Sequence, residues 1–176
     1  LVVYHSVTEE FFNTQKNFNI FLESLKKISL PKVWIMPNND AGSSIIKNDI
    51  LKKRENDIYI FDNLSREKYL YLLKNASSIV GNSSSGIIEA PTFKVPCVNI
   101  GRRQNKRLKA MNVIDVNTHD KNKIIRAIER SISKKFKEKL KNLVNPYGNG
   151  KSSQKIVDIL IKTKIDKELL FKEITY

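Results

Sequence analysis

The stretch SSIVGNSSSGIIEAP, residues 77–91, carries the pattern that decides the fold. A short apolar run, SSIVG (77–81), is followed by a polar loop with three consecutive serines and then by GIIEA (86–90). A short apolar run that ends at a turn signal is typical of a buried strand, and a serine before an apolar stretch is typical of a helix start. The stretch therefore predicts a strand, a hydroxyl-rich loop and a helix.

The same alternation extends along the chain. Six apolar, β-rich runs occur: LVVYH (1–5), KVWIMP (32–37), DIYIFD (57–62), SSIVG (77–81), VPCVNI (95–100) and VIDV (113–116). Amphipathic stretches of helical length, 9–28, 43–55 and 66–76, lie between the early runs. Strands that are apolar throughout and alternate with helices favour a parallel sheet covered on both faces. Because crossovers between parallel strands are right-handed, we expect an α/β fold with a doubly wound, Rossmann-like sheet of about six strands.

The first amphipathic stretch (9–28) places its apolar residues at helical spacing. Its large apolar side chains are Phe11, Phe18, Phe21, Leu22 and Leu25. This spacing predicts one helix whose apolar side faces the core.

The last third of the chain predicts helices alone. The helical stretches are DKNKIIRAIERSI (120–132), KKFKEKLKNL (134–143) and a segment from about Ser152 to Ile165. NPYGNG (145–150) is a strong helix breaker. We therefore expect a Rossmann-like domain over 1–144 and a carboxyl-terminal helix within 145–176 that packs on, or crosses toward, another domain.

Length and composition exclude several classes of protein. The 176 residues can bury the core of one domain, contain no apolar stretch long enough for a membrane helix and show no signal-peptide pattern. Cys97 is the single cysteine, which excludes an intrachain disulfide and a multi-thiolate metal site. We expect Cys97 in the core and the protein in the reducing cytoplasm. The opening LVVYHS lies inside an apolar strand, so we expect a domain of a longer protein.

The charge is strongly basic, with 32 Lys and Arg against 18 Asp and Glu and a net charge of +14. A nucleic-acid surface would cluster the basic residues and place aromatic residues between them. Here the lysines fall mostly on predicted helices, in ESLKK, DILKKRE and SKKFKEKLKNL. This pattern favours solvated helix faces over a nucleic-acid surface, although the charge can attract an anionic ligand.

The serine loop follows a strand, and ligands of open α/β sheets bind outside the carboxyl ends of the strands. Serine hydroxyls are rotatable donors, and a glycine lets the main chain come close to a ligand. Ser83, Ser84, Ser85 and Gly86 therefore form a candidate diphosphate site, while Glu89 could accept hydrogen bonds from the vicinal hydroxyls of a ribose. The alternative is that Ser83 or Ser84 only caps the helix. The loop is neither a GxGxxG nor a Walker A motif.

Two further loops follow strands. His5 ends the first strand, where a histidine can serve in acid–base chemistry because it titrates near neutrality, or can be structural. Asn38, Asn39 and Asp40 follow the second strand and either meet a substrate or form an Asx turn. We expect no metal site, because no second carboxylate cluster accompanies Asp40. His119, in NTHDKN, is expected to be exposed and inert.

Four motifs occur in a familiar order: YHSVTEE (4–10), MPNNDAGS (36–43), GNSSSGIIEAPTFKVPCVNIGRRQNKR (81–107) and NPYGNGKSS (145–153). In these motifs the chain resembles the hydrolysing UDP-N-acetylglucosamine 2-epimerases, a family that includes enzymes of the sialic-acid pathway. The resemblance covers nearly the whole chain but only the second half of such a protein. It implies a GT-B architecture of two Rossmann-like domains, with the active site in the cleft between them. This chain would then be the carboxyl-terminal, nucleotide-binding domain.

The resemblance also implies roles for individual residues of the nucleotide site. Ser83 and Ser84 would bind the diphosphate, and Glu89 the ribose. The stretch FDNLSREKY (61–69) lies where related folds hold the base, so Phe61 or Leu64 would border the uracil.

The sugar side of the site rests on a histidine and arginines. Arg103 in IGRRQ matches an arginine near the phosphates and sugar, where a guanidinium stabilises the charge of departing UDP. His5 matches a cleft histidine with a role in acid–base chemistry or in positioning the sugar. Arg107 would also face the cleft, and Arg102 falls at a variable position to which no role is transferred.

The implied chemistry is an elimination followed by a hydration. UDP leaves C1 as the C2 proton is removed, and water adds to the glycal to give free N-acetylmannosamine, without a redox cofactor. The carboxylates that handle the proton would lie on the absent amino-terminal domain, so this chain alone would bind nucleotide without turnover. A homo-oligomer is expected.

Several alternatives stay open. Some relatives use a 2,4-diacetamido sugar, and some use GDP in place of UDP. A GT-B glycosyltransferase would transfer the sugar to an acceptor, a sensor would bind nucleotide without chemistry, and a basic nucleic-acid-binding module would ignore UDP. NSSSG and IGRRQ favour a hydrolysing over a non-hydrolysing epimerase.

Overall fold

The computed structural model describes residues 1–52 and 57–171. It divides the chain into one compact unit, Leu1–Pro146, and a second, Tyr147–Tyr176. The last three residues of the predicted helix 43–55 lie outside the described residues.

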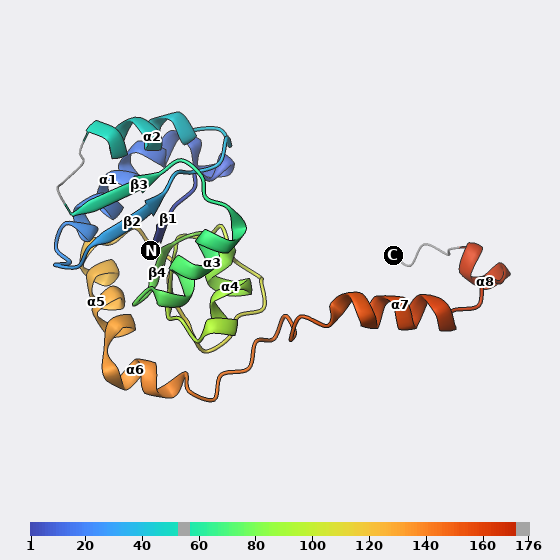
Figure 1. Ribbon diagram of the computed structural model, residues 1–176. Helices are drawn as coiled ribbons and strands as arrows, with labels where there is room; N and C mark the ends of the chain where they lie inside the picture. The colour runs from blue at the N-terminus through green and yellow to red at the C-terminus, as the bar shows by residue number, and fades with distance from the viewer. Residues whose placement is uncertain (53–56, 172–176) are drawn as a thin grey trace. The chain divides into compact units, whose positions relative to one another are not determined.

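The first unit is built on a parallel sheet of six strands in the order β3-β2-β1-β4-β5-β6 (Figure 1). The strands are β1 (Val2–Val3), β2 (Lys32–Ile35), β3 (Ile58–Phe61), β4 (Ile79–Gly81), β5 (Cys97–Ile100) and β6 (Val113–Val116). Each of the six predicted strands is present, and the predicted α/β, doubly wound fold is confirmed. The strand order reverses between β1 and β4, which is where ligands of such sheets bind.

Helices cover both faces of this sheet (Figure 1). They are η1 (Thr8–Asn13), α1 (Thr14–Leu25), α2 (Ser43–Lys52), α3 (Arg66–Asn75), α4 (Ser85–Ile88), η2 (Ala90–Phe93), α5 (Lys121–Ile132) and α6 (Lys134–Lys139). Phe18, Phe21 and Trp34 centre the larger buried cluster, which includes apolar residues of α1, α2 and α5. Leu73 of α3 and Cys97 of β5 belong to the second cluster, so Cys97 lies in the core as predicted. Successive strand residues point to opposite faces, which explains why β1 supplies Val2 to one cluster and Val3 to the other.

The prediction of one helix over 9–28 is wrong at its start. Glu10 has non-helical dihedral angles (φ −109°, ψ 18°), so a 3₁₀ segment precedes α1. The break turns Phe11 away from the apolar face of α1, and its side chain is 42% exposed. The core contacts begin with Thr14 and Phe18.

Gly81 at the end of β4 fixes how closely β4 approaches β1. Its φ is +140°, and a Cβ atom there would lie within 3.0 Å of the carbonyl oxygen of Val3. Only glycine suits this backbone and this space. The close approach brings the residue after Gly81, Asn82, beside the residues that follow β1.

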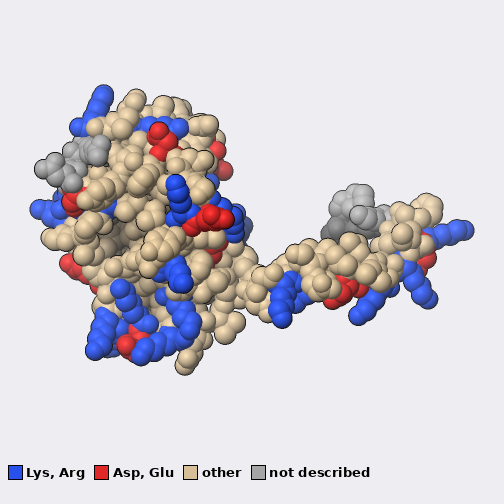
Figure 2. Space-filling view, in the orientation of Figure 1, with Lys and Arg blue, Asp and Glu red and all other residues tan. Residues whose placement is uncertain are grey.

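Basic side chains gather over α6 on the face shown in Figure 2. The aromatic residue of that segment, Phe136, is only 7% exposed and therefore cannot stack on a base at this surface. Arg130 lies over its ring, 5.5 Å from the centroid. The segment therefore presents lysines on a helix that is anchored by a buried phenylalanine.

The second unit contains α7 (Ser152–Lys162) and α8 (Lys167–Leu170). The helix α7 ends three residues before the predicted Ile165. Its apolar side chains are exposed: Ile156, Val157, Ile159, Leu160 and Ile161. In the described part of the chain, no helix combines the length and apolarity that a membrane crossing requires.

Candidate functional site

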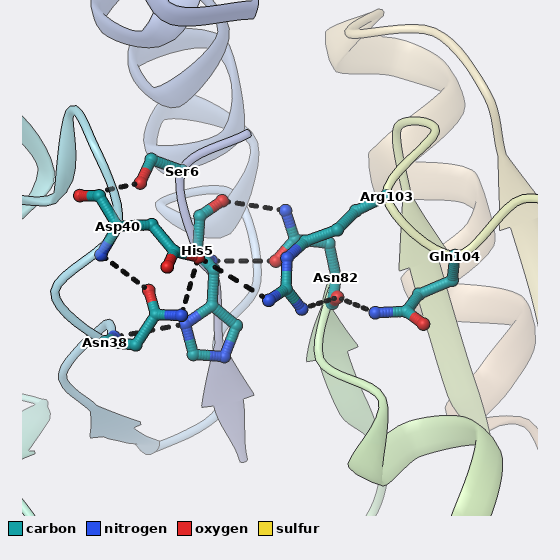
Figure 3. Close-up of polar contacts among 7 residues, drawn as sticks. All are labelled: His5, Ser6, Asn38, Asp40, Asn82, Arg103 and Gln104. Atoms are coloured by element: carbon teal, nitrogen blue, oxygen red, sulfur yellow. Dashed lines mark hydrogen bonds and ion pairs between the residues drawn. The ribbon is translucent and has the colours of Figure 1, made fainter. Parts of the chain in front are cut away.

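Four loops meet at the carboxyl edge of the sheet, at the reversal between β1 and β4 (Figure 3). His5 follows β1, Asn38 and Asp40 follow β2, Asn82 follows β4, and Arg103 follows β5. The structure therefore brings together the predicted histidine, the predicted arginine and the asparagine-rich turn.

Asn82 holds the centre of this group, and its side chain makes two hydrogen bonds with the main chain of His5. The His5 N–H donates to Asn82 Oδ1 at 2.7 Å, and Asn82 Nδ2 donates to the His5 carbonyl at 2.8 Å. The Asn82 carbonyl accepts from Arg103 Nη1 at 3.3 Å and from Gln104 Nε2 at 2.8 Å. The sequence pattern predicted no role for Asn82 or Gln104. The position of Asn82 directly after β4, where the strand order of the sheet reverses, could have indicated that it belongs to the site.

The ring of His5 is half-buried, and its Nδ1 accepts a hydrogen bond from the main-chain N–H of Asn38 at 3.2 Å. Burial, and then the charge of Arg103, lower the pKa of His5 to about 4, against the opposing effects of Asp40 and Asn38. The imidazole is therefore neutral near pH 7. Because Nδ1 is an acceptor, the proton lies on Nε2, and the ring offers an N–H donor at that atom.

This lowered pKa predicts a pH dependence of stability. As the pH falls, the unfolded chain takes up a proton on His5 near the ordinary pKa of 6.5, whereas the folded chain does so only near 4. The contribution is therefore fully present above pH 6.5 and lost as the pH falls toward 4. We expect urea unfolding at pH 7.5 and pH 5 to show a smaller loss of stability for His5→Gln than for the unmodified chain. His119→Gln separates the effect of the second histidine, and an identical pH response of His5→Gln and the unmodified chain would contradict the prediction.

The PNND loop forms the Asx turn that the sequence allowed. The Asp40 N–H donates to Asn38 Oδ1 at 3.4 Å, and Asn38 Nδ2 donates to Asp40 Oδ2 at 2.6 Å. The turn places the Asp40 carboxylate 3.7 Å from Nη2 of Arg103 (Figure 3). Asn39 points instead to Lys47, whose Nζ donates to its Oδ1 at 3.0 Å. Asp40 therefore orients the guanidinium.

The serine loop divides its hydroxyls between the edge of the sheet and the interior. Ser83 and Ser84 are half-buried, while Ser85 is 7% exposed and accepts a hydrogen bond from the Tyr69 hydroxyl at 2.7 Å. Ser84 occupies the N-cap position of α4, but its side chain makes no capping hydrogen bond with the described part of the chain. Ser83 Oγ accepts from the Ser85 N–H at 3.3 Å. Ser83 and Ser84 are therefore the hydroxyls available to a ligand.

Gly86 has a packing reason for lacking a side chain. A Cβ atom there would lie within 3.0 Å of Sγ of the buried Cys97. The glycine therefore lets α4 lie directly on β5, which the sequence analysis did not anticipate.

Glu89 ends α4 and pairs with Arg66, the first residue of α3. Arg66 Nη1 lies 3.1 Å from Glu89 Oε1, and the Arg66 side chain is 75% exposed. Arg66 was not predicted from the sequence to belong to the site, although it lies within the FDNLSREKY stretch. Phe61 and Leu64 of that stretch border a shallow apolar hollow beside α3.

Arg102 and Arg103 line a polar hollow together with Asp40 and residues of η1. Arg107 is exposed. The expectation that His119 is exposed is wrong: the side chain is half-buried, and its Nε2 lies 2.9 Å from the hydroxyl of the buried Tyr4. Gly101 permits this position, because its missing side chain leaves space for the imidazole.

Within residues 1–52 and 57–171, no group of three or more His, Cys, Asp and Glu side chains could hold a metal ion.

Comparisons with known proteins identify the family and the fold. Residues 1–161 match a family model described as UDP-N-acetylglucosamine 2-epimerase. A GDP/UDP-N,N'-diacetylbacillosamine 2-epimerase (hydrolyzing) of Campylobacter jejuni is 40% identical over 142 residues, which cover 78% of this chain and 36% of the relative. A UDP-N,N'-diacetylbacillosamine 2-epimerase (hydrolyzing) of Legionella pneumophila is 33% identical over 174 residues, 98% of this chain and 45% of the relative.

Solved structures show the same fold. The UDP-GlcNAc 2-epimerase of Methanocaldococcus jannaschii, solved in complex with UDP-GlcNAc and UDP, is 26% identical, with a TM-score of 0.68 over 91% of this chain and 44% of that one. The Neisseria meningitidis UDP-GlcNAc 2-epimerase, 20% identical, shows the fold with a TM-score of 0.71 over 92% of this chain and 44% of that one. The chain thus spans less than half the length of these proteins.

Proposed function

This chain belongs to the UDP-N-acetylglucosamine 2-epimerase family, and on that premise we propose that it is the nucleotide-binding, carboxyl-terminal half of a hydrolysing 2-epimerase with GT-B architecture. The observation that carries the proposal is the position of Ser83 and Ser84. Their hydroxyls lie half-buried after β4, at the reversal of the sheet, in the loop whose first residue binds Arg103 and His5. A diphosphate needs this combination of donors and positive charge.

We assign the groups of the site as follows. Ser83 and Ser84 donate to diphosphate oxygens, and the carboxylate of Glu89 accepts from the ribose hydroxyls. Arg103 stabilises the negative charge that develops on the leaving UDP. His5, neutral and protonated on Nε2, donates a hydrogen bond to the sugar or its phosphate, which favours positioning over proton abstraction.

The reaction then runs in two steps. In the elimination, the bond between C1 and the UDP oxygen breaks with its electron pair going to UDP, while a base removes the C2 proton and a double bond forms between C1 and C2. In the hydration, water gives its hydroxyl to C1 and a proton returns to C2 from the opposite face. We assign the base and acid to carboxylates of the amino-terminal half. The free sugar has inverted configuration at C2, and no redox cofactor takes part.

Two substrates fit this proposal. UDP-N-acetylglucosamine would give N-acetylmannosamine, as in sialic-acid synthesis. A UDP-linked or GDP-linked 2,4-diacetamido sugar is the second candidate, favoured by the 40% identity to the Campylobacter jejuni relative. Release of free sugar from each nucleotide sugar by the complete two-domain protein, followed by NMR without an acceptor, separates the two. A reaction that needs an acceptor would identify a glycosyltransferase instead. A cytoplasmic location and a homo-oligomeric assembly stay predictions.

Nucleotide binding is tested by calorimetric titration of this chain with UDP and then GDP. We expect UDP to bind, and Ser84→Ala and Glu89→Gln each to weaken binding about tenfold or more, because a hydrogen bond to a charged group contributes roughly 1.5–3 kcal/mol.

The matched controls are exposed residues of the same types, Ser77→Ala and Glu129→Gln, which should leave the affinity unchanged. If Ser84→Ala and Glu89→Gln behave like these controls, the serine loop is a structural turn and the nucleotide site lies elsewhere. Salt-sensitive binding of an oligonucleotide that UDP does not displace would support a nucleic-acid-binding module instead.

A further inference from the structure

The side chain of Asn82 continues the sheet beyond the ends of its strands. The regular pairing of β1 with β4 ends at Val3 and Gly81. The main-chain N–H of Asn82 still donates to the Val3 carbonyl at 3.2 Å. Beyond it, the carboxamide of Asn82 accepts from the N–H of His5 and donates to the carbonyl of His5, as a neighbouring strand residue would. His5 is therefore held on both its main-chain polar groups by one side chain.

The main-chain carbonyl of Asn82 binds two further side chains. Its carbonyl oxygen accepts from Arg103 and from the amide of Gln104, which is 1% exposed. Asn82 itself is 1% exposed, so its carbonyl oxygen, which accepts both bonds, is shielded from water. The next residue is Ser83, the first hydroxyl of the serine loop. One buried residue thus joins the histidine, the arginine and the hydroxyl donors.

We propose that Asn82 is a positioning residue that fixes His5 and Arg103 relative to the serine loop. This proposal rests on the function proposed above, because fixed positions of His5 and Arg103 matter only if both groups act on a bound nucleotide sugar. Reacting groups must be held in place to within a fraction of an ångström, and a displacement of about 1 Å can cost on the order of a hundredfold in rate. Asn82 would therefore act on turnover through His5 and Arg103.

The chemistry of the carboxamide makes the proposal testable by an isosteric change. In Asn82→Asp, one carboxylate oxygen still accepts from the His5 N–H, but the other faces the His5 carbonyl with no proton to donate. A protonated aspartic acid restores the missing donor. The burial of this position and the facing carbonyl oppose the charged form, whereas the guanidinium of Arg103 favours it. Because that guanidinium is already paired with Asp40, we expect protonation at a higher pH than for an exposed aspartate.

The matched control is Asn99→Asp. Asn99 is also 1% exposed. Its Nδ2 donates to Asp115 Oδ1 at 2.7 Å, whereas the Asn82 side chain bonds to His5. The change again buries a carboxylate against an oxygen acceptor. The facing oxygen here belongs to a carboxylate, so this variant also takes up a proton as the pH falls, but it does so without touching the proposed arrangement.

The first experiment measures kcat, KM and thermal unfolding of the complete two-domain protein between pH 5.5 and 8. For Asn82→Asp we expect kcat to fall about a hundredfold at pH 8, with a smaller change in KM. Relative to wild type, kcat should then recover as the pH is lowered. Asn99→Asp should show no such recovery. A kcat loss that simply follows the unfolded fraction, or a pH response equal to that of Asn99→Asp, would overturn the proposal.

The second experiment does not depend on turnover. NMR titration of selectively labelled histidine reports the pKa of His5, assigned with His5→Gln. Asn82→Ala frees the main chain of His5 and exposes its ring, so the pKa should rise toward the ordinary value of 6.5, with Asp40 and Arg103 still nearby. An unchanged pKa would overturn the proposal. If wild type turns over no nucleotide sugar while the pKa still rises, the proposed function fails and the positioning of His5 stands.

Discussion

On the proposed function, we expect replacement of Arg103 by alanine to lower kcat of the complete two-domain protein by a factor of about 10²–10³, the loss seen when one donor to a developing negative charge is removed. The guanidinium is held on two sides, by the Asn82 carbonyl at 3.3 Å and by the Asp40 carboxylate at 3.7 Å. It is therefore preorganised before any ligand binds. UDP binding should weaken less than kcat falls, because the charge on the leaving group is greatest after the bond to C1 begins to break.

Two variants make the Arg103 prediction specific. Arg102→Ala removes an equal charge from an exposed side chain that lines the same hollow, and should change kcat by less than about threefold. Arg103→Lys keeps the charge but loses the forked geometry, so we expect a loss between those of wild type and alanine. If Arg102→Ala lowers kcat as much as Arg103→Ala, the hollow acts through its overall charge and Arg103 has no individual role.

The sequence predicted the architecture because the architecture depends on local patterns. Each strand and each helix is specified by residues that are close together in the sequence, as an apolar run or an amphipathic stretch. The rule that crossovers between parallel strands are right-handed then allows only a few topologies for the sheet. The same reasoning placed His5 at the edge of the sheet, because it follows a strand, whereas Arg103 was assigned to the site only through the family resemblance. Its error at Phe11 came from extending a helical period through Glu10, where the backbone leaves helical geometry.

Pairings between distant residues could not be read from local patterns. Asn82 and His5 are 77 positions apart, and Tyr4 and His119 are 115 apart. Such contacts depend on the register of neighbouring strands and on backbone approaches such as the one Gly81 permits. For the same reason the sequence did not predict that Arg66 pairs with Glu89, although Arg66 lies in the FDNLSREKY stretch and Glu89 follows the serine loop.

We expect replacement of Gly86 by alanine to destabilise the chain by about 1–3 kcal/mol, the usual cost of forcing extra volume into a packed core. The added Cβ would overlap Sγ of Cys97, which is 3% exposed and lies within the second buried cluster. The better helix propensity of alanine offsets at most about 1 kcal/mol of this cost. Urea unfolding followed by the fluorescence of Trp34, the single and fully buried tryptophan, measures the change.

Adding Cys97→Ala to Gly86→Ala separates two roles of Gly86, packing against Cys97 and close approach to the ligand. In Gly86→Ala combined with Cys97→Ala the overlapping sulfur is gone, and the nearest remaining atoms lie 3.4 Å from the new Cβ. We expect the double variant to be more stable than the sum of the single changes by about 1–2 kcal/mol, as for residues in direct contact. UDP affinity should recover with stability, because Ser84 then keeps its place ahead of α4. If stability recovers but UDP still binds poorly, the added methyl group blocks the ligand, and Gly86 serves the approach of the phosphate as the sequence first indicated. If neither recovers, the overlap with Cys97 is not the cause of the defect.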